Sequence, residues 1–158
     1  MSTKIKIGVI IVNERDEILL IKEKLENKPN HLWNIIKGTY GDNGKETIFE
    51  TAIRECQEEA GVNVKLTNLL GCYIAQRIDK TRIQFNFLAK IVEGEPTLAN
   101  KKEQESRNEC INELKWFSKD DLIKINRDAF ISERAYAAVR DWIKGKSYSL
   151  DAVRHTEL

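Results

Sequence analysis

The chain has 158 residues, of which 41% are hydrophobic and 32% are charged, a balance that suits a globular protein with one hydrophobic core. Its 26 basic and 25 acidic side chains give a net charge of only +1, which argues against a general nucleic-acid or membrane surface. No apolar run reaches the roughly 18 to 20 residues that span a bilayer, and Met1 to Lys6 show no signal-peptide pattern. We therefore expect a single cytoplasmic domain over residues 1–158.

The first part of the chain alternates between strand-like runs and turns. Ile5 to Ile11 have a period of two, and a second apolar run, Ile18 to Ile21, follows a polar turn at residues 13–17. This pattern predicts two strands joined by a tight connection. Trp33 then precedes a glycine-rich stretch, residues 38–44, where loop backbone is expected.

Residues 47–60 change to a helical period. Apolar side chains recur at steps of three and four and predict one buried stripe made of Phe49, Ala52, Ile53, Cys56 and Ala60. Thr47 followed by Glu50 forms a capping-box pattern at the start, and Gly61 suits the left-handed position after the last turn. A helix with well-defined ends is expected here.

The second half predicts more strands and two further helices. Residues 101–108 are polar and predict a surface loop. Periodicity and capping patterns predict strands at residues 66–76, 81–92 and 114–117 and helices at residues 118–121 and 132–144. The order of strands, helix, strands and helix indicates an α/β (α+β) fold in which a mixed β-sheet is sandwiched between helices.

The cysteines give no sign of a disulfide framework or a zinc cluster. Cys56, Cys72 and Cys110 are odd in number and widely spaced. We expect all three to be buried or partly buried free thiols.

Three glutamates carry the most informative pattern. Glu55, Glu58 and Glu59 lie at i, i+3 and i+4, so their carboxylates should project from one side of the helix, opposite the apolar stripe. The surrounding segment, residues 41–59, holds six acids against two bases, a local charge of −4. Such acids form either a solvated helix face or a site for a hard divalent cation such as Mg²⁺.

These residues resemble the Nudix box, a pattern written G-x5-E-x7-R-E-U-x-E-E-x-G-U in which U is a bulky apolar residue. The matching residues are Glu46, Arg54, Glu55, Cys56, Glu58, Glu59, Gly61 and Val62. Counting back from Glu46 places the glycine of the pattern at Tyr40. Trp33 and Gly38 instead lie where the family's W-x-x-P-G-G segment would place them, so we interpret Gly38 as the box glycine, followed by a loop two residues longer than usual.

The resemblance implies a metal-dependent hydrolase of phosphoanhydride bonds in nucleoside di- or triphosphates or related nucleoside diphosphate compounds. It assigns metal binding to Gly38, Glu55, Glu58 and Glu59, with Mg²⁺ expected and Mn²⁺ as an alternative ion. Glu46 and Arg54 inherit a supporting role, because the planar guanidinium of an arginine can orient carboxylates without competing for metal.

The general base is left between two positions. Glu55 is the first candidate, as such glutamates are in some family members, whereas other members use a loop acid. Glu109 and Glu113, just before the strand that contains Trp116, are the loop-side candidates here. With only His31 and His155 in the chain, a histidine base is not expected.

Substrate recognition rests on weaker patterns. Trp33, Lys37, Tyr73 and Arg77 are candidate substrate-binding residues, although partial burial in the core is an alternative for the two aromatic side chains. The expected partner is a small nucleotide-type molecule, with no membrane and no extended nucleic acid, bound by a monomer or homodimer. The alternatives are a catalytically silent nucleotide-binding Nudix module and a dinucleoside polyphosphate or RNA-cap pyrophosphohydrolase.

Overall fold

The computed structural model describes residues 1–158 as seven strands, four α-helices and two short 3-10 helices. The strands are β1 (Ser2–Ile11), β2 (Ile18–Glu23), β3 (Leu32–Asn34), β4 (Ile36–Thr39), β5 (Asn63–Arg77), β6 (Lys80–Glu93) and β7 (Ile111–Phe117). The helices are α1 (Ile48–Ala60), α2 (Lys101–Ser106), α3 (Lys119–Ile123) and α4 (Glu133–Ile143), with the 3-10 helices η1 (Arg127–Ala129) and η2 (Leu150–Ala152).

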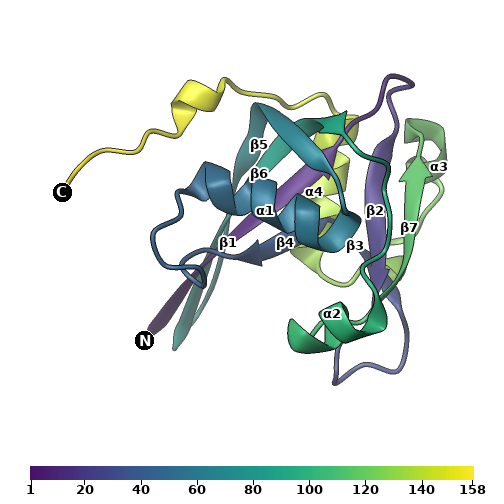
Figure 1. The fold of residues 1–158 in the computed structure, drawn as a ribbon, viewed down its shortest axis with the longest axis horizontal. Helices are drawn as coiled ribbons and strands as arrows, with labels where there is room; N and C mark the ends of the chain where they lie inside the picture. The colour runs from purple at the N-terminus through teal and green to yellow at the C-terminus, as the bar shows by residue number, and fades with distance from the viewer.

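The strands form two sheets between helices. Four strands pair in the order β4-β1-β6-β5, and the other three pair in the order β3-β2-β7. β1 runs parallel to β6, while all the other pairs are antiparallel. Figure 1 shows α1 in front of the strands and α4 behind them, and each helix packs into its own hydrophobic cluster. The predicted mixed sheet between helices is confirmed, with the difference that the strands divide into two sheets.

Helix α1 has the predicted ends but not entirely the predicted buried face. Thr47 caps its start through a capping box with Glu50, and Gly61 ends it at a left-handed φ of 66°. Ile53, expected in the buried stripe, is 38% exposed. Its place on the buried face is taken by Glu55 and Glu59, because β4 packs along that side of the helix.

Residues 101–108, which were predicted to be a loop, begin instead with helix α2. Asn100 caps this helix by accepting a hydrogen bond from the Glu103 backbone N–H at 2.8 Å. The Gln104 amide donates to the Ile111 carbonyl at 3.0 Å and accepts from the Ile111 N–H at 2.7 Å. The helix buries no residue, so it has no hydrophobic periodicity that the sequence could reveal.

The remaining expectations have mixed outcomes. Helix α4 is capped by Ser132 as predicted, and four of its side chains are buried.

The cysteines differ in exposure. Cys56 is buried, but Cys72 and Cys110 are exposed, because Cys72 lies on the outer face of β5 and Cys110 lies in the loop before β7. All three cysteines are free thiols. None of the helices has the length and apolar composition that a membrane span requires.

Candidate active site

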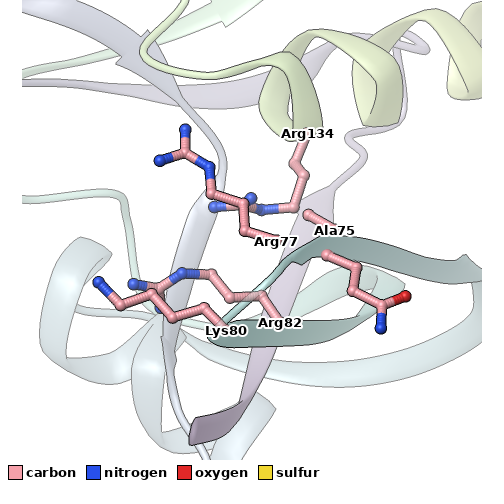
Figure 2. A pocket seen from close by; sticks show the side chains of 6 residues that line it. Ala75, Arg77, Lys80, Arg82 and Arg134 are labelled. Atoms are coloured by element: carbon pink, nitrogen blue, oxygen red, sulfur yellow. The ribbon is translucent and has the colours of Figure 1, made fainter. Parts of the chain in front are cut away.

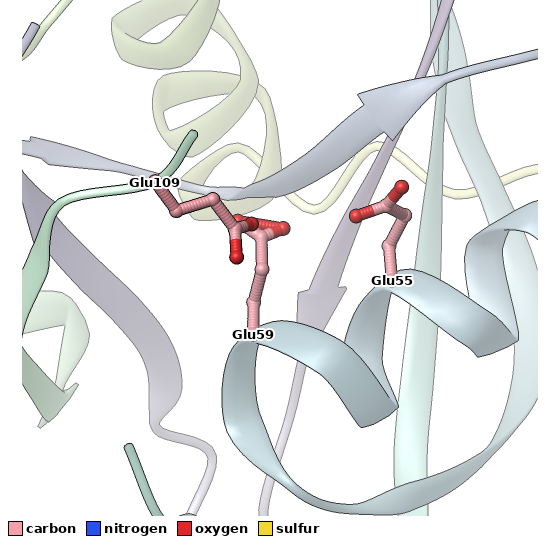
Figure 3. A group of neighbouring side chains, drawn as sticks. All are labelled: Glu55, Glu59 and Glu109. Carbon is pink, nitrogen blue, oxygen red and sulfur yellow. The ribbon is translucent and has the colours of Figure 1, made fainter. Parts of the chain in front are cut away.

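Three carboxylates converge where α1 faces the segment between α2 and β7. Glu55 and Glu59 lie on α1, and Glu109 approaches from the opposite segment, so that one oxygen of each lies within 4.8 Å of the others (Figure 3). Glu55 is only 6% exposed and Glu59 only 3%. The helix glutamates therefore lie at the edge of the core and not on a solvated face, which excludes the alternative of an ordinary surface helix for these two residues.

Strand β4 brings its backbone against the same carboxylates. The Lys37 N–H donates to Glu59 Oε2 at 3.1 Å. A Cβ on the next residue, Gly38, would overlap the Glu55 carboxylate, so a larger residue here would displace that side chain from its present position. Tyr40, the alternative position for the box glycine, packs its side chain against the hydrophobic core instead. The geometry at Gly38 supports its interpretation as the glycine of the motif.

Arg54 holds three carboxylates in place. Its Nε donates to both oxygens of Glu46, at 2.9 and 3.0 Å, and its Nη1 donates to Glu55 at 3.0 Å and to Glu58 at 3.2 Å. The remaining nitrogen, Nη2, is buried without a partner. One guanidinium thus links Glu46, Glu55 and Glu58, of which only Glu55 is among the three acids of the cluster.

A second arginine, Arg107, was not predicted. Its Nε donates to Glu109 Oε1 at 2.8 Å, and its Nη2 donates to the backbone carbonyl of Glu58 at 3.0 Å. The residue follows α2 directly, so it fastens that segment to α1 and orients the loop-side carboxylate. The only signal in the sequence was the alternation of Arg107 and Glu109, which is common on any surface loop.

Burial and mutual repulsion favour the protonated forms of the clustered acids. Burial raises the pKa of Glu55 to about 7, against the opposing effect of Arg54 and with a further contribution from Glu58. Burial, followed by the charges of Glu55 and Glu109, raises the pKa of Glu59 well above its ordinary value. The pKa of Glu109 is also raised by burial, although Arg107 opposes this. A divalent cation would replace the protons that these carboxylates otherwise hold.

The donor set fits a hard cation. All the clustered side-chain donors are carboxylate oxygens, the ligands that Mg²⁺ prefers, and an open side for water and phosphate oxygens is usual for this ion. The cluster opens into a cleft of about 420 Å³, which we call the acidic cleft. Its lining includes six acids, Glu23, Asp42, Glu55, Glu58, Glu59 and Glu109, and three bases, Lys37, Arg54 and Arg107.

Not all of the predicted substrate-binding residues reach the acidic cleft. Lys37 lines it. Trp33 is 9% exposed and packs edge-on against Phe117 at 4.8 Å between ring centroids. The Tyr73 hydroxyl donates to Asp141 Oδ2 at 2.6 Å. Arg77 lines a different pocket, at the β5–β6 hairpin.

Of the two loop-side acids, only one belongs to the site. Glu109 is in the carboxylate cluster, whereas Glu113 pairs with Lys22 within the β2–β7 ladder. Glu23, at the end of β2, also lines the acidic cleft and accepts a hydrogen bond from the Asn34 amide at 2.7 Å. It was not predicted, because a single acid at a strand end carries no recognisable pattern.

Comparisons with known proteins agree with the motif. The family model described as the NUDIX domain matches residues 3–139. A NUDIX hydrolase from Nitrosomonas europaea superimposes with a TM-score of 0.78 at 22% identity, over 98% of both chains. A MutT NUDIX hydrolase from Burkholderia pseudomallei gives 0.69 at 21% identity, over 89% of this chain and 98% of its own. A structure named as a UDP-X diphosphatase gives 0.63 at 21% identity, over 92% of this chain and 64% of its own.

At these identities the structural likeness establishes the fold, and the family model covers most of the sequence, including the helix that carries the glutamates. The chain belongs to the Nudix hydrolase family.

Proposed function

We propose that this protein is a magnesium-dependent hydrolase that cleaves a phosphoanhydride bond in nucleoside di- or triphosphates, or in compounds that contain a nucleoside diphosphate. The observation that carries this proposal is the convergence of Glu55, Glu59 and Glu109 beside Gly38. Buried acids that repel one another without a metal become a phosphate-binding device with one. The structural neighbour named as a UDP-X diphosphatase agrees with a diphosphate substrate.

In this proposal the cation is held by Glu55, Glu59 and Glu109, with Glu58 beside them and the Gly38 carbonyl as a further ligand. When bound, the cation would neutralise phosphate oxygens and lower the pKa of the attacking water. Lys37 and Arg107 line the same cleft and would bind the negative phosphates.

The general base is one of two residues at the cluster. Glu55 and Glu109 both line the acidic cleft, and burial raises the pKa of both carboxyl groups. The pKa of Glu55, about 7, suits a general base near neutral pH. Arg54 and Arg107 each hold one of these carboxylates in a fixed position. The two can be distinguished by replacing each acid with glutamine and measuring kcat as a function of pH. The rise of kcat with pH should disappear only in the variant that lacks the general base.

The direct test is a screen of nucleoside diphosphates, nucleoside triphosphates and nucleotide sugars with Mg²⁺, with products identified by mass. Hydrolysis in ¹⁸O-labelled water would show which phosphorus is attacked. We expect cleavage between two phosphates and a requirement for the cation. Tight nucleotide binding without turnover of any compound would contradict the proposal and favour a catalytically silent module.

Magnesium should stabilise the protein, and more so at higher pH. The folded-state pKa of Glu55, about 7, lies above its ordinary value. Folding therefore favours the protonated Glu55 carboxyl. Its contribution to the stability of the fold is complete below about pH 5 and is lost as the pH rises through 7, where the carboxyl ionises. At a fixed concentration, ten times the dissociation constant at pH 8.5, Mg²⁺ should raise the thermal midpoint by about 3 to 6 °C at that pH. The increase should be larger at pH 8.5 than at pH 6 and should be reversed by EDTA. An equal increase at both values would argue against binding at this cluster.

A further inference from the structure

A second pocket, which we call the basic pocket, lies at the end of the β5–β6 hairpin beside the first turn of α4 (Figure 2). Its volume is about 360 Å³, and its six lining residues are Ala75, Gln76, Arg77, Lys80, Arg82 and Arg134. Four of these are cations and none is an acid, in a protein whose net charge is only +1. None of the four takes part in an ion pair within the protein.

The fold brings these cations together at a cost. Lys80 and Arg82 lie on β6, where they pair with Arg77 and Ala75 of β5, and Arg134 reaches down from α4 toward them (Figure 2). An arginine in the first turn of a helix lies at the positive end of the helix dipole. Burial, and then the charge of Arg82, lowers the pKa of Arg134, and its Nε is buried without a hydrogen-bond partner. An anion would relieve each of these unfavourable features.

Three lysines, Lys4 and Lys6 of β1 and Lys37 of β4, lie between the basic pocket and the acidic cleft. Lys4, Lys6 and Gly8 alternate along β1, so they face the same side of the sheet. In the sheet, Lys4 pairs with Arg82 on β6, and Gly8 pairs with Lys37 on β4. The Lys6 ammonium donates to Thr39 Oγ1, in the wall of the acidic cleft, at 2.6 Å.

The charges around Lys6 agree with this placement. Burial and then Arg82 lower the pKa of Lys6, while Glu55 has the opposite effect. Lys6 therefore interacts with an arginine of the basic pocket and with a glutamate of the cluster, and the strand register places Lys4, Lys6 and Lys37 between the two sites.

We propose that the basic pocket binds a second phosphate group of the substrate, separate from the anhydride that is cleaved. This inference rests on the proposed function. It defines the substrate class as a nucleoside diphosphate compound that carries an additional phosphate monoester. Arginine side chains bind phosphate oxygens in pairs, and a pocket of about 360 Å³ that is lined by four cations and no acid has room for a phosphate group.

The test compares substrates that differ by one phosphate. Two matched pairs, NADH with NADPH and dephospho-coenzyme A with coenzyme A, each contain a diphosphate linkage. We expect a higher kcat/KM for the phosphorylated member of at least one pair. Arg82→Gln and Arg134→Gln should lower that kcat/KM about tenfold or more, mainly by raising KM. For the member without the additional phosphate, NADH or dephospho-coenzyme A, kcat/KM should stay within about twofold. Arg154→Gln, at an exposed position without an ion pair, is the matched control.

A binding measurement separates this inference from the proposed function. Inorganic phosphate is titrated in EDTA, where no cation recruits anions to the acidic cleft, and its binding should be lost in Arg82→Gln. Hydrolysis with no preference within either pair, unaffected by both substitutions, would overturn the inference and leave the function standing. Phosphate binding that is lost in the variants, without any preference between substrates, would identify a site for free phosphate and also overturn it. Absence of hydrolysis for every compound would overturn the proposed function itself.

Discussion

Glu59→Gln should lower kcat about 100-fold or more at saturating Mg²⁺, because it removes a charged ligand from the centre of the carboxylate cluster. The fold should survive, since the glutamine carbonyl can still accept the hydrogen bond that the Lys37 N–H donates to Glu59 at 3.1 Å. The metal-free thermal midpoint at pH 8 should not fall, because a buried acid with a strongly raised pKa is replaced by a neutral amide. Steady-state kinetics and thermal denaturation measure the two effects separately.

The matched control for this substitution is Glu105→Gln on α2, an exposed glutamate outside the acidic cleft. It should leave both kcat and the response to Mg²⁺ unchanged. Near-normal turnover of Glu59→Gln would show that the cluster does not carry the reaction. A variant that lost activity only because it unfolded would be recognised by its lowered thermal midpoint.

Arg54→Lys should lower kcat about 10- to 100-fold, the usual effect of losing a partner that orients metal ligands. The charge is kept, and the helix propensities of the two residues are nearly equal. A single ammonium group cannot reproduce the contacts of the guanidinium, which reaches Glu46 through Nε and both Glu55 and Glu58 through Nη1. The Mg²⁺ concentration needed for half-maximal activity should rise as well.

Arg154→Lys serves as the control for this exchange, since Arg154 is exposed and makes no ion pair. Kinetics should be normalised to the folded fraction, determined by circular dichroism. Strong destabilisation of Arg54→Lys with normal turnover per folded molecule would make Arg54 a structural residue. It would then have no part in organising the glutamates.

Local patterns were enough to predict α1 and its ends. The Thr47 capping box and the Gly61 stop depend only on neighbouring residues, and both occur as expected. The spacing from Trp33 located Gly38, which the structure places against Glu55. The exposure of Ile53 could not be predicted in this way, because the direction in which a helix faces is set by the strand that packs against it.

Contacts between distant segments limited the prediction of the remaining site. The choice between Glu109 and Glu113 depended on the register of β7, which places Glu113 in the sheet and leaves Glu109 before it. Tyr73 was predicted to bind substrate, and its hydrogen bond to Asp141 of α4 depends on packing that no local pattern shows. Three cations of the basic pocket lie within residues 77–82, but Arg134 lies more than 50 positions further along the chain, and only the packing of α4 over the hairpin brings it to them.

The third carboxylate of the cluster, that of Glu109, lies just after helix α2. Helix α2 contributes no buried side chain, and it is held mainly by the hydrogen bonds of Gln104 to Ile111 and of Arg107 to the Glu58 carbonyl. Such a segment can open locally while the core stays folded, and Glu109 would leave the cluster with it. Cation affinity and the local order of α2 are therefore thermodynamically linked. A substitution at Gln104, whose side chain hydrogen-bonds only to the backbone of Ala99 and Ile111, would weaken cation binding by favouring the open segment.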